Sequence, residues 1–172
     1  SSTSRGLGDV YKRQVFEEMT GESSSGYGID GCSAPNHATS LKGLATAMAR
    51  MGVGVRGPAS LRLVEAMAKY PLLVAGEGRA CSELMSAVGG RIVLKTGAEG
   101  VYTAILPEQG LGIALKIDDG ATRGSECAIA ALLVRLGLAD EKHPMIRKRM
   151  FSILKNATGL EVGNIRPAEC LM

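Results

Sequence analysis

The stretch from residue 91 to residue 120, RIVLKTGAEGVYTAILPEQGLGIALKIDDG, constrains the fold more than any other part of the sequence. It predicts three strands in a row, Arg91–Lys95, Val101–Leu106 and Leu111–Asp118, which are rich in residues that suit a pleated surface. Between the second and third lies Pro107-Glu108-Gln109-Gly110, where proline presets a turn and glycine can close it in the left-handed conformation. The sequence therefore predicts an antiparallel three-stranded meander.

The third predicted strand alternates in character, so it predicts which residues share a face. The large apolar face consists of Leu111, Ile113, Leu115 and Ile117. The opposite face carries the small residues Gly112 and Ala114. A helix is expected over Gly124–Leu136 from its apolar spacing, with Gly137 as its end signal. Because this helix is also rich in alanine, we expect it to pack on Gly112 and Ala114.

Lys95 ends the first predicted strand, directly after Ile92, Val93 and Leu94. A lysine that leaves a buried strand can sit at a sheet edge or in a cleft. Desolvation of a lysine lowers its pKa and can turn it into a base near neutral pH. By position alone, the better explanation is a lysine that extends to solvent from a strand end.

Composition limits the classes of function. The chain has 172 residues, about one domain, and 45% of them are hydrophobic but only 3% aromatic, so we expect an aliphatic core. A net charge of +3 and a pI near 8.7 are too small to indicate a nucleic-acid partner. The sequence contains no long apolar run and no signal-peptide pattern, so we expect neither export nor a membrane partner.

The four cysteines are widely spaced and form no C-x-x-C pair; they are Cys32, Cys81, Cys127 and Cys170. This spacing argues against a zinc ribbon and against a disulfide scaffold. Reduced thiols and a cytoplasmic location are therefore expected.

Residues 1–14, SSTSRGLGDVYKRQ, show no clean apolar period, and the chain does not begin with Met. This stretch is similar to the translated adapter sequence found at the start of metagenomic fragments. We therefore expect residues 1–14 to be an artefactual extension, and residues 15–172 to be the C-terminal part of a single domain. Val15–Gly28 is polar and rich in Gly and Ser, and within it Glu22-Ser23-Ser24-Ser25-Gly26 is expected to be a loop.

Apolar spacing and helix-end signals predict further helices and one loop. The helices are Ala38–Met51, Pro58–Tyr70, Arg79–Val88 and Pro144–Lys155, and the loop is Leu72–Gly78. Before the first of them, YGIDGCSAPN at residues 27–36 predicts a tight turn, since it holds two glycines and a proline. Asp30 and Cys32 are two residues apart, so an extended chain would place both on one side.

Four motifs, in this order, resemble the type II L-asparaginases of the rhizobial kind. They are YGIDGCSAPN at residues 27–36, VAGEGR at 74–79, LKTGAEGV at 94–101 and GLGIALKIDDG at 110–120. The resemblance extends from about Tyr27 to Pro167. It implies an α/β (α+β) fold, the C-terminal portion of the serine β-lactamase and penicillin-binding-protein architecture. In those proteins a K-T-G motif lies on a strand, and residues 95–97 spell it here.

The resemblance implies hydrolysis of the small molecule L-asparagine to aspartate and ammonia, by serine nucleophiles with lysine partners. Lys95 matches the family's late catalytic lysine, and Asp30 matches an acid that helps to shape the site. Thr96 and Glu99 are expected to contact the substrate or to support residues that do. The family also has a zinc site of two cysteines and a lysine, and its second cysteine matches Cys32. The intact enzyme is expected to be a homodimer.

The family's first S-x-x-K, its second serine and its C-S-x-K zinc segment lie upstream of the matched motifs, and this sequence has none of them. A serine needs an adjacent base and structural zinc takes four ligands, so we expect an incomplete zinc site and no activity from this chain alone. Ser152-Ile153-Leu154-Lys155 has S-x-x-K spacing but follows Lys95, on a predicted surface helix, so no catalytic role is expected for it. On chemistry alone, Cys32 is better explained as a structural thiol.

Two alternatives stay open. A glutaminase or a β-lactamase-like amidase would share the K-T-G motif, and a thiol-bearing binding module without catalysis would need no serine. Other conspicuous side chains have structural explanations: a solvated helix face for the basic cluster Lys142, Arg147, Lys148 and Arg149, a loop position for His37, and helix packing for Cys81 and Cys127.

Overall fold

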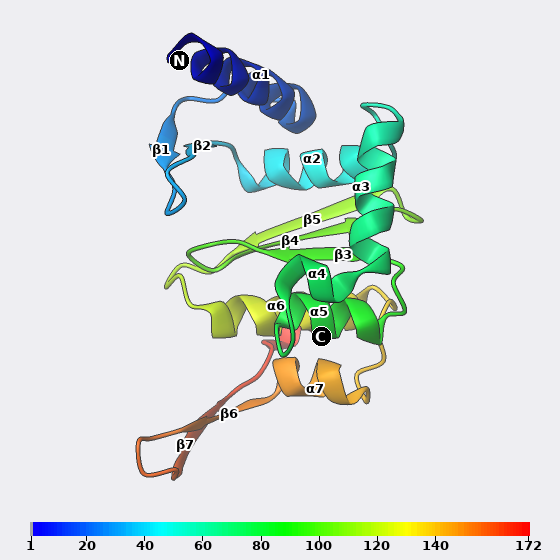
Figure 1. Ribbon diagram of the computed structural model, residues 1–172. Helices are drawn as coiled ribbons and strands as arrows, with labels where there is room; N and C mark the ends of the chain where they lie inside the picture. The colour runs from blue at the N-terminus through cyan, green and yellow to red at the C-terminus, as the bar shows by residue number, and fades with distance from the viewer. Residues whose placement is uncertain (1) are drawn as a thin grey trace.

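A three-stranded antiparallel sheet lies between two layers of helices in the computed structural model, which describes residues 2–172 (Figure 1). The sheet order is β3-β4-β5, formed by Val93–Thr96, Val101–Leu106 and Leu111–Lys116. Both neighbouring pairs are antiparallel, as predicted for a meander. The chain thus has the α+β fold that the sequence predicted, with an antiparallel meander flanked by helices.

The turn between β4 and β5 has the geometry that its proline and glycine predict. Gly110 has a φ of 62°, and its N–H donates to the carbonyl of Pro107 at 3.2 Å. The tight turn fixes the register, in which Leu106 faces Leu111 and Thr103 faces Ala114. Local turn chemistry therefore sets which residues of β5 share a face with those of β4.

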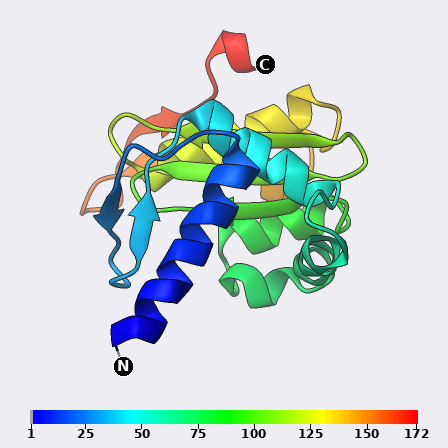
Figure 2. The same ribbon diagram turned by 90° about the horizontal axis from the view of Figure 1, so that it is seen from above.

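The helices on one side of the sheet are α1 (Ser2–Thr20), α2 (Leu41–Gly52) and α3 (Pro58–Lys69). α2 lies on β5, α1 crosses over the outer side of α2, and α3 descends toward the other layer (Figures 1 and 2). Ser40 is the N-cap of α2, and its hydroxyl oxygen accepts a hydrogen bond from the Gly43 N–H at 2.9 Å.

The helices on the other side are α4 (Pro71–Ala75), α5 (Ala80–Ala87), α6 (Thr122–Arg135) and α7 (Pro144–Met150) (Figure 1). The main core lies between this layer and the sheet and is aliphatic, as expected from the composition. Its largest fully buried side chains include Leu84, Met85, Leu94, Tyr102, Leu106, Ile129, Leu133, Ile146 and Met150.

Two hairpins stand outside these layers. One consists of β1 (Tyr27–Ile29) and β2 (Pro35–His37) and lies between α1 and α2 in the chain. The other consists of β6 (Ser152–Lys155) and β7 (Glu161–Ile165) and projects away from the helices (Figure 1). A short 3₁₀ turn, η1 (Glu169–Leu171), follows it.

The N-terminal segment forms α1 as far as Thr20, although its sequence shows no clean apolar period, and the expected loop at residues 22–26 follows without helix or strand until β1 begins. Phe16 and Met19 line an apolar groove between α1 and α2, so tertiary packing stabilises this helix. Arg50 of α2 donates to the main-chain oxygen of Glu18 at 2.7 Å and so binds the end of α1. A helix with few apolar positions gives too weak an apolar period to be recognised without its partner.

The predicted helix Pro144–Lys155 is wrong in its second half. α7 ends at Met150, and the following residues form β6 of the projecting hairpin. Asn156 turns the chain there, since its side-chain oxygen accepts from the N–H groups of Thr158 and Leu160 at 3.1 and 2.9 Å. The apolar residues Ile153 and Leu154 fit a helical period but are exposed on this hairpin.

The predicted contact between the small face of β5 and the helix at 124–136 is also wrong. A Cβ at Gly112 would overlap the backbone oxygen of Ala45 and lie 2.5 Å from the amide nitrogen of Ala49, so this face packs directly on the backbone of α2. α6 covers the opposite face. Both helices contain small residues, and the sequence did not show which one approaches the glycine.

The expected loop Leu72–Gly78 begins with a helical turn, because α4 starts at Pro71 and ends at Ala75. Proline ends one helix and is also favourable at the first position of the next, and here it does both. Among residues 2–172, no helix has the length and apolar character needed to cross a membrane.

Candidate functional site

A cavity of about 810 Å³ lies where the β1–β2 hairpin and α2 face the end of β3. Four of the predicted site residues line it: Asp30, Lys95, Thr96 and Glu99. Leu44 and Met48 of α2 provide an apolar wall opposite them. The fold therefore brings an acid from one hairpin together with the K-T-G segment from a distant strand.

Lys95 lies on the face of the sheet that α2 covers, opposite Thr103 of β4. Its Nζ donates to the main-chain oxygen of Thr96 at 2.8 Å, and the Thr103 hydroxyl donates to the main-chain oxygen of Lys95 at 3.2 Å. The strand before it is buried, as predicted, but the Lys95 side chain is exposed. β3 is an edge strand and the cavity is open, so Lys95 extends to solvent, the explanation that its position alone favoured.

Thr96 follows Lys95 at the same strand end, and its backbone is hydrogen-bonded to the core. Its backbone N–H donates to the sulfur of Cys81 at 3.2 Å, and the hydroxyl of Tyr102 donates to the same sulfur at 3.0 Å. Cys81 and Tyr102 are fully buried. Burial, together with Cys81 as neighbour, raises the pKa of Tyr102, so the phenol stays a neutral donor. The sequence explained Cys81 as packing alone and missed this contact with the site.

Glu99 lies in the turn between β3 and β4 with a φ of 53°, a left-handed conformation that is uncommon outside glycine. Its carboxylate lies against Gly120, where a Cβ would be 2.9 Å from Oε2. The turn is therefore packed on the loop that follows β5. Glu99 is exposed at the cavity rim.

Asp30 and Cys32 share the turn of the β1–β2 hairpin. Ser33, with a φ of 65°, donates its N–H to the main-chain oxygen of Asp30 at 2.8 Å, and the Asp30 N–H donates to Ala34 at 2.9 Å. The Cys32 thiol donates to the Asp30 carboxylate at 3.4 Å, so the two side chains do lie together. Cys32 is exposed in the turn and does not line the cavity.

These two side chains do not fit a zinc site by themselves. Zinc in a structural site takes four ligands, commonly thiolate, imidazole or carboxylate. Within residues 2–172, no group of three or more His, Cys, Asp or Glu residues is arranged to hold a metal ion. Cys32 and Asp30 could supply at most two ligands.

The remaining conspicuous residues lie away from the cavity. Ser152 and Lys155 are on the projecting hairpin, where the Ser152 hydroxyl donates to the main-chain oxygen of Lys148 at 2.8 Å. His37 lies at the end of β2 rather than in a loop, and its ring contacts the ring of Phe16 in a tilted arrangement and that of Tyr27 edge-on, with centroids 5.7 and 5.9 Å away.

The basic cluster is more than a solvated helix face. The side chain of Arg149 is only 12% exposed and pairs with Glu83 at 2.5 Å and with Glu126 at 2.7 Å. Lys148 also reaches Glu83, at 2.7 Å. These pairs join α5, α6 and α7. The predicted exposure is wrong for Arg149, because two acids from other helices meet it.

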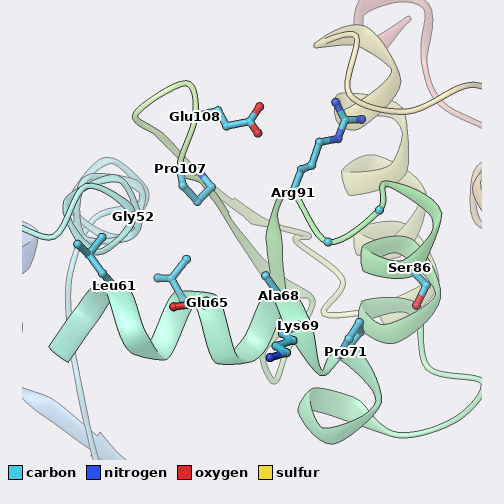
Figure 3. A pocket seen from close by; sticks show the side chains of 13 residues that line it. Gly52, Leu61, Glu65, Ala68, Lys69, Pro71, Ser86, Arg91, Pro107 and Glu108 are labelled. Atoms are coloured by element: carbon cyan, nitrogen blue, oxygen red, sulfur yellow. The ribbon is translucent and has the colours of Figure 1, made fainter. Parts of the chain in front are cut away.

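A second large cavity, of about 790 Å³, opens between α3, α5 and the β4–β5 turn (Figure 3). Charged side chains surround it, including Glu65 and Arg91. Figure 3 shows that these groups do not converge, and Arg91 instead donates to the main-chain oxygens of Val88 and Leu138, at 3.0 and 3.3 Å. None of the predicted site residues lines it, so the chemistry favours the cavity at Lys95.

Comparison with protein families agrees with the motifs. The family described as L-asparaginase II matches residues 10–167, which is most of the chain. The match begins before the motifs at Tyr27 and within residues 1–14, whose artefactual origin stays a prediction. No curated protein matches the chain.

Proposed function

The chain belongs to the L-asparaginase II family, and on this premise we propose that its cavity at Lys95 is part of the site at which the intact enzyme hydrolyses L-asparagine to L-aspartate and ammonia. A family of asparaginase-type amidohydrolases takes a small-molecule substrate, and the cavity is large enough for an amino acid. The observation that carries the proposal is the convergence of Asp30, Lys95 and Thr96, from separate segments, on that one cavity.

Lys95 is the proposed proton carrier at the reacting amide. Its ammonium group lies on the cavity wall, where the Thr96 carbonyl orients it at 2.8 Å. In this role Lys95 would move a proton between a nucleophile and the leaving ammonia, a task that a positioned acid or base performs. Thr96 and Glu99 are proposed to contact the substrate from the rim, and Asp30 to shape the opposite wall.

The chain by itself is proposed to be inactive. Among the described residues, no serine lines the cavity, and the hydroxyl groups on its wall belong to Thr96 and Thr103. Both of these hydroxyls donate to main-chain oxygens, at 3.3 and 3.2 Å. An activated serine with a nearby base is the proposed nucleophile of the intact enzyme, and it would have to come from outside these residues.

Zinc is proposed only for the intact enzyme and only with ligands in addition to Cys32 and Asp30. Their separation of 3.4 Å allows both to face one ion, but two ligands are too few. A homodimer and a cytoplasmic location stay predictions.

The test is release of ammonia from L-asparagine and L-glutamine, and ring opening of a β-lactam, by the chain and by a longer form that supplies a serine with its lysine. We expect turnover of L-asparagine by the longer form and none by the chain. Preference for glutamine or a β-lactam would favour another amidohydrolase on this scaffold. No turnover of any of the three by a folded longer form would contradict the proposal.

A further inference from the structure

A second cavity of about 540 Å³ borders the cavity at Lys95 and is lined by residues of α1, β2, α2, β4 and β5. Asn36, Leu44 and Val101 line both, so the two spaces share a wall. The second cavity also has two charged residues of opposite sign, Lys116 and Asp118. Both belong to the motif GLGIALKIDDG, to which the proposed function gives no role.

Strand register places Lys116 and Lys95 on the same face of the sheet. Lys116 of β5 faces Val101 of β4, and Lys95 of β3 faces Thr103 of β4, two residues further along. Two strand spacings across and two residues along give roughly 12 Å between the two lysine Cα atoms. Both lysines have flexible four-carbon stems, so their ammonium groups can approach one small ligand that lies over β4.

The two neighbouring acids of this motif differ in what they contact. Asp119 accepts a hydrogen bond from the Ala121 N–H at 2.8 Å and pairs with Arg123 at 3.0 Å, so it belongs to the turn and to the start of α6. Asp118 is exposed, lines the second cavity, and makes no side-chain hydrogen bond or ion pair with the residues that the structure describes. Lys116 donates only to the adjacent Ile117 carbonyl, at 2.8 Å. An unpaired carboxylate and a nearby ammonium are complementary to a zwitterion.

We propose that the second cavity is a subsite for the head group of a free α-amino acid, in which Asp118 binds the α-ammonium and Lys116 the α-carboxylate. The side chain of the ligand would then extend past Val101 to Lys95. This subsite rests on the proposed function and narrows its substrate class, because an amino acid that is peptide-bound or blocked at its nitrogen lacks one of the two charges. A ligand that lacks one of the two charges loses a charge-assisted hydrogen bond, so the subsite would bind it much more weakly than a free amino acid.

The test is an NMR titration of the folded chain with L-asparagine and with two ligands that each lack one charge. Succinamic acid has no α-ammonium, and 3-aminopropanamide has no α-carboxylate. We expect the wild-type chain to bind each partial ligand at least tenfold more weakly than L-asparagine. Lys116→Met should weaken binding of L-asparagine at least tenfold and leave 3-aminopropanamide unaffected. Asp118→Asn should weaken L-asparagine similarly and leave succinamic acid unaffected.

The matched control is Lys142→Met, which removes an exposed lysine outside both cavities and should bind every ligand like the wild type. If folded Lys116→Met and Asp118→Asn bind L-asparagine with wild-type affinity, the proposed subsite is wrong. It is also wrong if the wild-type chain shows no binding at tens of millimolar L-asparagine. Ammonia release in an active form would separate the two proposals. If Lys116→Met and Asp118→Asn hydrolyse L-asparagine with an unchanged KM, the subsite is contradicted and the proposed reaction is not. If the ligands bind as expected but L-asparagine is not hydrolysed, the proposed reaction is contradicted and the subsite is not.

Discussion

The backbone N–H of Thr96 donates a hydrogen bond to the sulfur of Cys81, 3.2 Å away. This contact joins the K-T-G segment at the cavity to α5 in the core, across the outer edge of the sheet. An edge strand has unpaired backbone groups, and here a buried thiol satisfies one of them. The position of the candidate site on its strand therefore depends on a side chain that lies outside the cavity.

Cys81→Ala should destabilise the chain more than its small volume change implies. It removes the shared acceptor of the Thr96 N–H and the Tyr102 hydroxyl, and leaving a buried donor without its acceptor costs about 1 to 3 kcal/mol. Cys127→Ala is the matched control, because that thiol is also buried but only donates, to the Met150 oxygen. Urea unfolding measures the free energy of unfolding of both variants. Equal losses of stability in the two variants would contradict the role of Cys81 as an acceptor. Hydrogen exchange at the Thr96 amide should accelerate only in the Cys81 variant.

Lys95→Met should lower kcat by a factor of about 10² to 10⁴ in a form of the protein that hydrolyses L-asparagine, because a positioned acid or base contributes about that much. Since Lys95 is exposed, the thermal midpoint should stay within a few degrees of the wild type. Lys155→Met and Ser152→Ala, on the projecting hairpin, should leave kcat unchanged. Retention of more than half the rate in Lys95→Met, with loss in Lys155→Met, would mean that the wrong lysine was assigned.

Gly112→Ala should destabilise the chain by about 1 to 3 kcal/mol, the range for overpacking a tight contact. Its new methyl group would overlap the backbone oxygen of Ala45, and helix backbone cannot move aside as a flexible side chain can. Gly163→Ala is the control: it is also a strand glycine, but its nearest neighbour, the Leu154 side chain, would be 3.8 Å away. The free energy of unfolding in urea should be near wild type for Gly163→Ala. A similar result for Gly112→Ala would show that α2 does not lie on this face.

Zinc should bind the chain weakly. Cys32 and Asp30 offer two ligands, and the described residues provide no third to complete the group. After dialysis against a mild chelator, we expect the zinc content of the wild type to be as low as that of Cys32→Ser. Stoichiometric zinc in the wild type alone would reveal a ligand set that the geometry does not show.

The stability contributed by Glu83 should depend on pH. Burial alone would raise the pKa of Glu83, but hydrogen bonds and charges from Lys148 and Arg149 outweigh it and lower that pKa below its ordinary value of 4.5. A carboxylate with a depressed pKa stabilises the fold above its unfolded pKa and loses this effect as the pH falls through the folded one. Glu83→Gln should therefore be less stable than wild type at pH 7, and the gap should shrink below about pH 4.5.

Glu77→Gln is the control, because Glu77 is exposed and makes no ion pair among the described residues. Chemical unfolding of all three proteins between pH 2.5 and 7 checks the prediction. A gap between Glu83→Gln and wild type that stays constant over this range would show that the ion pairs with α7 contribute nothing to the titration.

Several elements could be predicted because neighbouring residues determine them. The bounds of β4 agree with the prediction, since a proline-glycine turn and a run of strand-forming residues lie within a few positions of each other. Pro58 begins α3 and Gly137 follows α6 for the same reason. The predicted helix at 144–155 failed where two local signals competed, because the apolar spacing favoured a helix while Asn156 and Gly159 favoured a hairpin turn.

The sequence by itself determined the meander, its turns and the position of Lys95 at the end of a strand, because backbone sterics and turn chemistry act over a few residues. Only the tertiary structure decided that Asp30 shares a cavity with Lys95, that Cys81 holds Thr96, and that α2 rather than α6 approaches Gly112. These relationships join segments far apart in the chain. They depend on which surfaces fit closely enough to exclude water, and no local pattern in the sequence contains that information.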